Sequence, residues 1–156
     1  MTPEDLFATH QPHLPAFSLI WTAVVDIAPR EDLGETPQGR RFIVPILGGR
    51  VFAGPGGEGL SGEVLPGGAD RQLVDARGFK TLDALYEMRT QAGDILTVRN
   101  RCRIDESVPG APYEMSAISA TAPVGPRDWM NRRVLVGTLE TAKPDRDAVI
   151  VRGWAT

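Results

Sequence analysis

Two carboxylates and one tyrosine are the residues of this sequence whose types and spacing are suited to acid–base chemistry. Asp70 ends the turn sequence PGGAD, and Asp83 and Tyr86 lie in the run KTLDALYEMRT. A carboxylate within a strand is unfavourable unless it faces water, pairs with a basic group or lines a cavity. Because burial raises the pKa of a carboxyl group, one that lines a cavity can act as a general base. We therefore take Asp83, Asp70 and Tyr86 as the candidate catalytic residues.

Asp83 has two interpretations that the sequence leaves open. It either forms an ion pair with Arg99, Arg101 or Arg41 on a neighbouring strand, or lines a cavity as a general base. Successive side chains of a strand point to opposite faces, so Asp83 and Tyr86 can share a cavity only if a bulge separates them.

Four further residues are candidates for contacting a ligand: Arg41, Arg99, Tyr113 and Trp129. Arg41 or a tyrosine hydroxyl could stabilise an oxyanion that develops when a proton is removed. Tyr113 and Trp129 could wall an aromatic-lined pocket, or else cap one end of the fold.

Motifs that suggest other chemistry fail in their sequence context. GPGGEG (54–59) matches G-x-G-x-x-G, but the Gly- and Pro-rich residues after it cannot form the helix that a phosphate site needs. His10 and His13 form H-x-x-H without a third ligand nearby, which is typical of surface histidines. No serine lies in a G-x-S-x-G turn, and Cys102 on an apolar strand face is typical of an inert buried thiol. We expect no metal and no cofactor.

Composition limits the class of protein. A chain of 156 residues is long enough for one sizeable core, and its net charge of −3 offers no basic surface to nucleic acid or to an anionic membrane. The single cysteine cannot form an intramolecular disulfide, and the acidic N-terminal residues lack the apolar core of a signal peptide. The longest apolar run, FSLIWTAVV, is too short for a membrane helix. We expect a cytoplasmic location.

The elements that would position these residues are strands. The 17 glycines and 13 prolines favour turns over helices, and β-branched and aromatic residues fill the runs between them. Only residues 2–7, with Thr2 as N-cap and Pro3 in the first turn, and residues 125–132 suggest short helical turns. Strands are predicted at 17–27, 40–47, 60–66, 70–76, 80–90, 94–104, 113–121, 132–141 and 148–155.

Short strands at regular spacing, without amphipathic helices between them, predict an all-β protein: a single antiparallel β-barrel of eight or more strands. Alternation supports this, because Leu82, Ala84 and Tyr86 share one face while Asp83 and Glu87 share the other. We expect residues 1–13 to form an N-terminal arm or short helix, residues 14–156 to form the barrel, and helix to account for under about 15% of the chain.

Three stretches of the chain resemble the segments of a known family: LGETPQGRRFIVPILGGRVFAGPGGEGLSGEVLPGGADRQLV, LDALYEMRTQAG and WMNRRVLVGT. The first is similar to the signature of an uncharacterised bacterial family, the domain of unknown function 3237 family, also called UPF0311, and the other two are similar to its later segments. The resemblance extends from about Leu14 to Trp154 and implies a small β-barrel that associates as a dimer. It assigns no catalytic residues.

Three positions depart from the pattern of that family. Arg71 stands where the family usually has Trp, Leu85 where it often has Arg, and Cys102 where it tends to have Gly. These departures suggest an altered pocket or an altered ligand.

Two functions of different class fit the sequence. In the first, the protein is a cofactor-free isomerase, lyase or cyclase whose carboxylate removes a proton from a small, largely apolar carbonyl compound or phenol. In the second, the barrel binds a small apolar or aromatic ligand without reaction. A dimerisation module is a third possibility.

Overall fold

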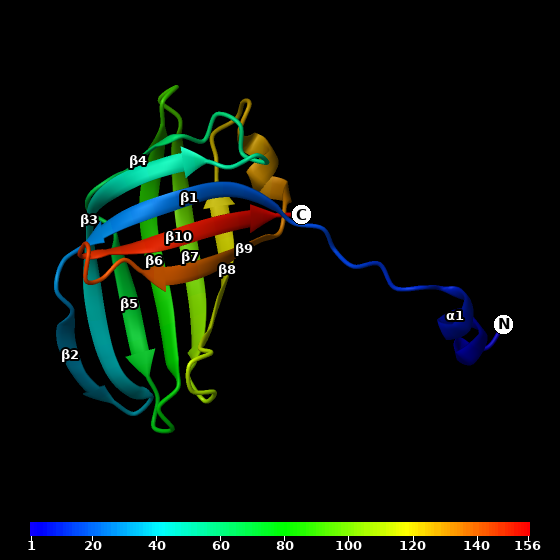
Figure 1. The fold of residues 1–156 in the computed structure, drawn as a ribbon, viewed down its shortest axis with the longest axis horizontal. Helices are drawn as coiled ribbons and strands as arrows, with labels where there is room; N and C mark the ends of the chain where they lie inside the picture. Colours follow the sequence, from blue (N-terminus) through cyan, green and yellow to red (C-terminus); the bar gives the residue numbers. More distant parts are fainter.

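Strand pairing closes the sheet of this protein into a barrel. The computed structural model describes residues 1–156 and shows ten strands, every pair of which runs antiparallel (Figure 1). The strands are β1 (Ser18–Ile27), β2 (Glu31–Thr36), β3 (Gly39–Ala53), β4 (Gly62–Val64), β5 (Ala69–Val74), β6 (Lys80–Thr90), β7 (Ile95–Asp105), β8 (Tyr113–Thr121), β9 (Leu135–Thr141) and β10 (Ala148–Ala155). The predicted antiparallel barrel is therefore confirmed.

The wall follows the order β1-β10-β9-β8-β7-β6, then β4 and β5, then β3, which pairs with β1 and completes the ring. Strands β4 and β5 both lie between β6 and β3, so they share one of the eight wall positions. Strand β2 lies outside this ring, as a hairpin partner of β3. Full closure leaves the wall strands paired on both sides, which removes sticky edges.

Strand β3 bends at Gly48 and Gly49, where it changes partners. Its first half pairs with β2 and β5, and its second half pairs with β1 and β4. Gly49 has φ +150°, and a β-carbon there would overlap the carbonyl oxygen of Val24 on β1. Only glycine allows this close approach, so the pair of glycines makes the corner of the barrel.

The apolar core fills the end of the barrel shown at the top of Figure 1. Trp21, Leu60, Leu96 and Met130 are fully buried there, and a 3₁₀ helix, η1 (Asp128–Arg132), packs against β8 and caps this end. The opposite end carries the β5–β6 and β7–β8 loops. Because the core occupies one end only, the other end is free to hold a cavity.

Helix is scarce, as predicted. Helix α1 (Pro3–Thr9) and η1 are the two helical segments, and the expected N-cap Thr2 forms a capping box with Asp5. Figure 1 shows α1 extended away from the barrel, and none of its residues is buried. Strand β2 and the second half of β3 were not predicted from the sequence, because their polar and glycine-rich residues lack the usual strand pattern.

Candidate functional site

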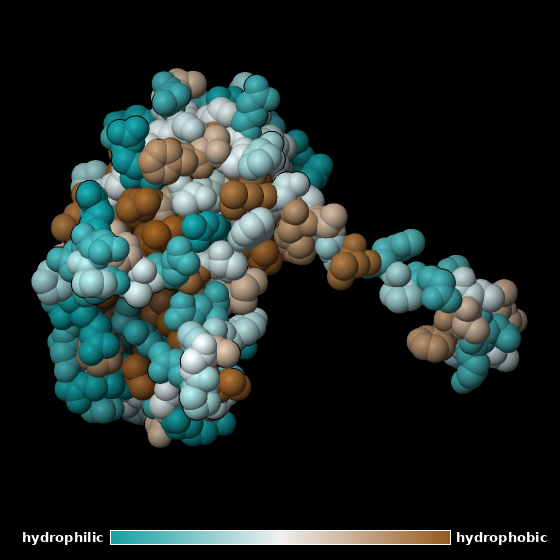
Figure 2. All heavy atoms as spheres, viewed as in Figure 1, coloured by the Kyte–Doolittle hydropathy of each residue, from teal (hydrophilic) through white to brown (hydrophobic).

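A cavity of about 240 Å³ lies inside the barrel, at the end opposite the core. Its lining comes from the start of β6, β8 and β10, the end of β1, β7 and β9, and from β3 and β5. Figure 2 shows apolar residues recessed between hydrophilic ones on the lower half of the molecule. An apolar cavity of about 150 Å³ binds benzene, which has six non-hydrogen atoms. In proportion, the cavity of this protein accommodates a ligand of about ten non-hydrogen atoms.

Strand register arranges one wall of the cavity in layers. The outermost layer holds Lys80 and Glu114, two strands apart at the mouth. The next layer holds Gln72, Leu82 and Cys102, which are paired across β5, β6 and β7. The third, deeper layer holds Asp70, Ala84 and Asn100 in the same order, and Tyr86 lies one step deeper on β6. Because Ala84 is small, the space between Asp70 and Asn100 stays open.

The two walls of the cavity differ in polarity. The polar residues of the layers described above come from β5, β6, β7 and β8, and the end of β9 adds Glu140 and Thr141, whereas β1, β3 and β10 contribute apolar side chains only. The apolar wall consists of Val25, Ile27, Val44, Ile46, Val149 and Val151. This division favours a ligand with one apolar face and one hydrogen-bonding edge.

Asp70 is the acidic residue of the deep layer. Gln72 Nε2 donates a hydrogen bond to Asp70 Oδ2 at 2.8 Å, while the buried Oδ1 has no protein partner. Burial raises the pKa of Asp70 above its ordinary value, and the Gln72 hydrogen bond, the backbone N–H of Asp83 and the charge of Lys80 offset this only in part. Asp70 thus presents a free carboxyl oxygen inside the cavity and can exchange a proton with a ligand.

Tyr86 lines the cavity as well, at its floor. Its side chain is 2% exposed and its hydroxyl has no protein partner. Burial raises the pKa of Tyr86, so the hydroxyl keeps its proton and can donate a hydrogen bond.

Gln72 and Asn100 also line the cavity, although neither is among the site residues predicted from the sequence. Gln72 Oε1 and Asn100 Oδ1 are buried without a hydrogen-bond partner, and Asn100 is 3% exposed. The sequence contains a signal for Asn100: it is a polar residue on the strand face that the apolar residues Leu96 and Val98 share. Polar residues on an apolar strand face need a partner inside the fold.

Cys102 also lines this cavity. Burial raises the pKa of its thiol to about 11, so the reactive thiolate is scarce at neutral pH. Of the three departures from the family pattern, Arg71 and Leu85 are exposed on the outer face, and only Cys102 changes the cavity.

Asp83 lies on the outer face of the barrel and does not line the cavity. Arg99 Nη2 lies 2.8 Å from Asp83 Oδ2, and the two side chains are about half exposed. The hydrogen bonds and charge of Arg99 lower the pKa of Asp83. Of the two interpretations left open for Asp83, the structure thus shows the ion pair, with Arg99 as the partner. The other interpretation, a cavity base with Arg99 as a ligand contact, is corrected. Strict alternation holds along β6, and no bulge turns Asp83 inward.

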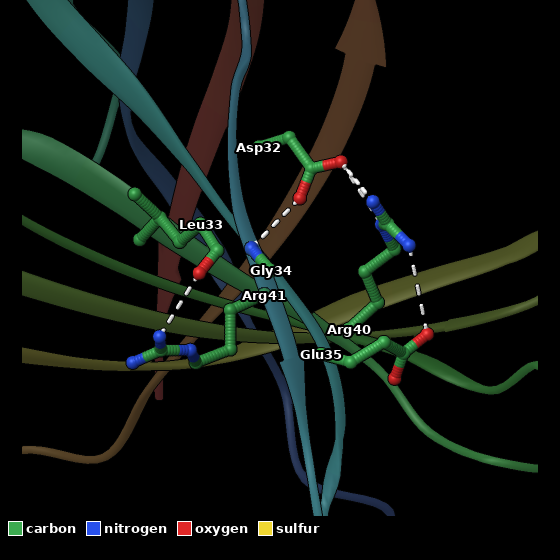
Figure 3. A network of polar contacts seen from close by, with 6 residues as sticks. All are labelled: Asp32, Leu33, Gly34, Glu35, Arg40 and Arg41. Atoms are coloured by element: carbon green, nitrogen blue, oxygen red, sulfur yellow. Dashed lines mark hydrogen bonds and ion pairs between the residues drawn. The ribbon is translucent and has the colours of Figure 1, made fainter.

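Arg41 is also outside the cavity. It lies in the β2–β3 hairpin, where its Nη2 donates a hydrogen bond to the carbonyl oxygen of Leu33 at 3.0 Å (Figure 3). Arg40 in the same hairpin pairs with Asp32 and Glu35. The proposed oxyanion role of Arg41 is corrected, because alternation on this hairpin directs it away from the interior.

Tyr113 and Trp129, the two aromatic candidates, also lie outside the cavity. Tyr113 starts β8 and is 55% exposed on the outer surface. Trp129 belongs to η1 and packs against the core at the closed end, so it caps the barrel and does not wall the cavity. Of the seven predicted site residues, the structure brings only Asp70 and Tyr86 to the cavity.

We expect Asp83→Asn to leave the melting temperature nearly unchanged, because exposed ion pairs contribute little to stability. Ligand binding should also be unaffected, since Asp83 faces solvent. Thermal melts of this variant beside Arg99→Gln check both statements. A large loss of stability in either variant would show that the pair is more important than its exposure indicates.

The glycine-rich motif of residues 54–59 forms turns at the closed end of the barrel. Gly54 N–H and Gly56 N–H donate hydrogen bonds to the carbonyl oxygens of Ile20 and Leu19 at 2.9 Å. A β-carbon on Gly57 would overlap the carbonyl oxygen of Ile20. These glycines thus allow the loop to pack on β1, and the loop precedes strand β4, not a helix.

No group of three or more His, Cys, Asp or Glu side chains is arranged to hold a metal ion. His10 and His13 are both exposed in the N-terminal arm. No helix in the structure has the length and apolar character needed to cross a membrane.

These features define a small antiparallel β-barrel with an amphipathic interior cavity. The chain belongs to the family described as "Protein of unknown function (DUF3237)", whose model matches residues 15–155. A UPF0311 protein of Rhodopseudomonas palustris is 40% identical over 81 residues, which are 52% of this chain and 50% of that protein. The chain thus spans about half the length of the curated relatives that it matches.

Solved structures share the barrel over most of the chain. A conserved protein of unknown function from Rhodopseudomonas palustris matches with a TM-score of 0.80 and 26% identity, over 93% of this chain and 99% of that chain. A structure described as an enzyme from Penicillium herquei matches with a TM-score of 0.72, over 94% of this chain and 97% of that chain. At 18% identity, the second likeness shows the fold alone.

Proposed function

We propose that this protein is a cofactor-free enzyme that performs acid–base chemistry on a small, largely apolar carbonyl compound or phenol. The reaction class is isomerisation, elimination or cyclisation, in which a proton leaves one atom of the substrate and returns to another. Asp70 is the group that accepts and returns the proton.

One observation carries this proposal: Asp70 Oδ1 is buried and unpartnered beside an amphipathic cavity. A general base works best when its pKa lies near the working pH, and burial shifts the pKa of Asp70 upwards. The hydrogen bond from Gln72 holds the other carboxyl oxygen, so the free oxygen has a defined place in the cavity.

Removal of a proton next to a carbonyl, or from a phenol, leaves negative charge on a substrate oxygen. Tyr86 can stabilise that charge, because its buried hydroxyl keeps its proton and has no competing partner. The proton then passes from Asp70 to the product, so neither an oxidant nor a reductant takes part.

The Penicillium herquei protein supports the proposal in one respect only: a protein of this fold is described as an enzyme. The alternative function is a barrel that binds the same class of ligand without reaction. The amphipathic cavity fits both functions.

Deuterium exchange separates these two functions. Small molecules that copurify with the protein, identified by mass spectrometry after denaturation, define the compounds to test. Each is incubated with protein in D₂O, and proton NMR follows its C–H signals. We expect exchange at one position at least about 10²-fold faster than in buffer.

Asp83→Asn serves as the control, because this variant alters a carboxylate outside the cavity. Binding of a compound without exchange or conversion would contradict the enzymatic function and leave the binding barrel.

We also propose that the protein forms a homodimer, as its family resemblance implies. Several large apolar side chains on the outer face are about half exposed, among them Leu47, Phe52 and Leu85. Exposed apolar side chains of this kind favour an interface between copies.

A further inference from the structure

The deep part of the cavity contains hydrogen-bond acceptors that the protein itself does not satisfy. Gln72 Oε1 and Asn100 Oδ1 are buried and unpartnered, as is Asp70 Oδ1. A buried polar atom without a partner costs about 1–3 kcal/mol, and native folds hold only a few such atoms. Three in one cavity indicate that a ligand supplies hydrogen-bond donors there.

The orientation of Gln72 follows from its neighbour. Its Nε2 donates to Asp70 Oδ2 at 2.8 Å, which turns the amide nitrogen towards Asp70, and its amide oxygen has no partner. Residues 70 and 72 point to the same face of β5, because side chains alternate along a strand. The Asp70 carboxylate therefore makes Gln72 an acceptor towards the ligand.

Asn100 faces the same space from β7. Register pairs Asp70 with Ala84 and Ala84 with Asn100, which separates the two polar residues by two strands, or about 10 Å across the sheet. Ala84 between them leaves room for a ligand edge. Asn100 is 3% exposed, and its amide oxygen is buried without a hydrogen-bond partner.

Charge limits what can reach this layer. Asp70 is the one ionisable acid among the deep lining residues, and Lys80, the one basic lining residue, lies at the mouth. Glu114 lies across the mouth from Lys80, and Glu140 pairs with Arg152. An anionic group at the deep end would meet Asp70 with no positive charge beside it, which is unfavourable in a cavity.

We propose that Gln72 and Asn100 select the substrate of this site: an uncharged molecule with an apolar face and at least two hydroxyl or amide N–H donors along one edge. The apolar face lies against Val25, Ile46 and Val151, and the donors meet the two amide oxygens. Carboxylates and phosphates are rejected from the deep end. This inference rests on the site proposed above and adds the substrate class to it.

Three meta-substituted benzenes, each small enough for the cavity, test the selection. Resorcinol carries two hydroxyl donors, 1,3-dimethoxybenzene carries none, and 3-hydroxybenzoate carries a negative charge. Titrations followed by protein NMR report the affinity of each. We expect resorcinol to bind at least about 10-fold more tightly than the ether, which is the effect of one or two hydrogen bonds. The benzoate should bind more weakly than resorcinol.

Two variants assign the effect to the amides. Asn100→Leu and Gln72→Leu each remove one acceptor at similar volume, and each should reduce the preference for resorcinol over the ether several-fold. Gln91→Leu, in the exposed β6–β7 turn, is the matched control and should leave the preference unchanged. Two variants at different strands keep the test valid if one fails to fold.

Equal affinity for resorcinol and the ether would overturn the inference, as would failure of resorcinol to bind at its highest usable concentration. Unchanged preference in both leucine variants would also overturn it. Because this readout is binding and that of the proposed function is exchange, either can fail alone. Selective binding without exchange leaves the inference intact and contradicts only the enzymatic function.

Discussion

Asp70→Asn is expected to lower the rate of catalysed exchange by about 10²–10⁴, the usual contribution of a general base. The substitution keeps the size of the side chain and an oxygen that can accept the hydrogen bond from Gln72. Affinity for a bound ligand should therefore change little. Exchange kinetics and NMR titration on the same sample measure the two effects.

Stability should move in the opposite direction from activity. Burial raises the pKa of Asp70 in the folded state, so the folded protein binds this proton more tightly than the unfolded chain does. The free energy of unfolding then falls as pH rises from the ordinary carboxyl pKa of about 3.9 through the raised value. Asn carries no charge at any pH, so Asp70→Asn should melt at or above the parent temperature at neutral pH.

Other carboxylates have the opposite pH dependence, which provides the comparison. Arg146 lowers the pKa of Asp26, and Arg99 lowers the pKa of Asp83. The stability that these two aspartates contribute is therefore lost as pH falls through their lowered pKa values. Melting temperatures of parent and Asp70→Asn between pH 4 and pH 8, a range of about four units above the ordinary carboxyl pKa, isolate the Asp70 contribution. If Asp70→Asn catalysed exchange at the parental rate, Asp70 would not be the general base of this site.

Ala84→Leu is expected to lower both the ligand affinity and the exchange rate by roughly 10²-fold. The reason is that the added side chain fills the space between Asp70 and Asn100. The leucine enters a cavity of about 240 Å³, so it should not overpack the fold. We expect its melting temperature to equal or exceed that of the parent, as for other cavity-filling changes.

Ala117→Leu is the matched control for this experiment. Ala117 lies in β8 on the exposed outer face, so the same added volume does not enter the cavity. It should bind and exchange as the parent does. If Ala84→Leu also behaved as the parent, the cavity would not be the site of binding or of catalysis.

Local sequence pattern determined the barrel. Strand alternation depends only on neighbouring residues, so Leu82, Ala84 and Tyr86 were placed correctly on one face and Asp83 on the other. Turns need glycine or proline where the backbone requires them, which placed most strand boundaries. Strand β2 was missed, because its polar residues fit the exposed hairpin that β3 supports and show no apolar face of their own.

The site needed the tertiary structure. Asp70 faces the interior because β5 pairs with β6 in a hairpin and also with the first half of β3, which is about 30 residues away in the chain. The sequence alone could not tell which carboxylate had an arginine beside it: Arg99 pairs with Asp83 on the outer wall, whereas no arginine lines the cavity that contains Asp70. Burial and charge around a carboxylate are sums over non-local neighbours, whereas alternation is local.

The same reason explains Gln72 and Asn100. The inward face of Asn100 follows from the sequence, since Asn100 alternates with Leu96 and Val98 on β7. Only closure of the barrel brought the two amides and Asp70 into one cavity and left their oxygens without protein partners. The sequence by itself thus determined the strands and their faces, while the cavity and its free polar atoms arose from the way eight wall positions close around a core that fills only one end.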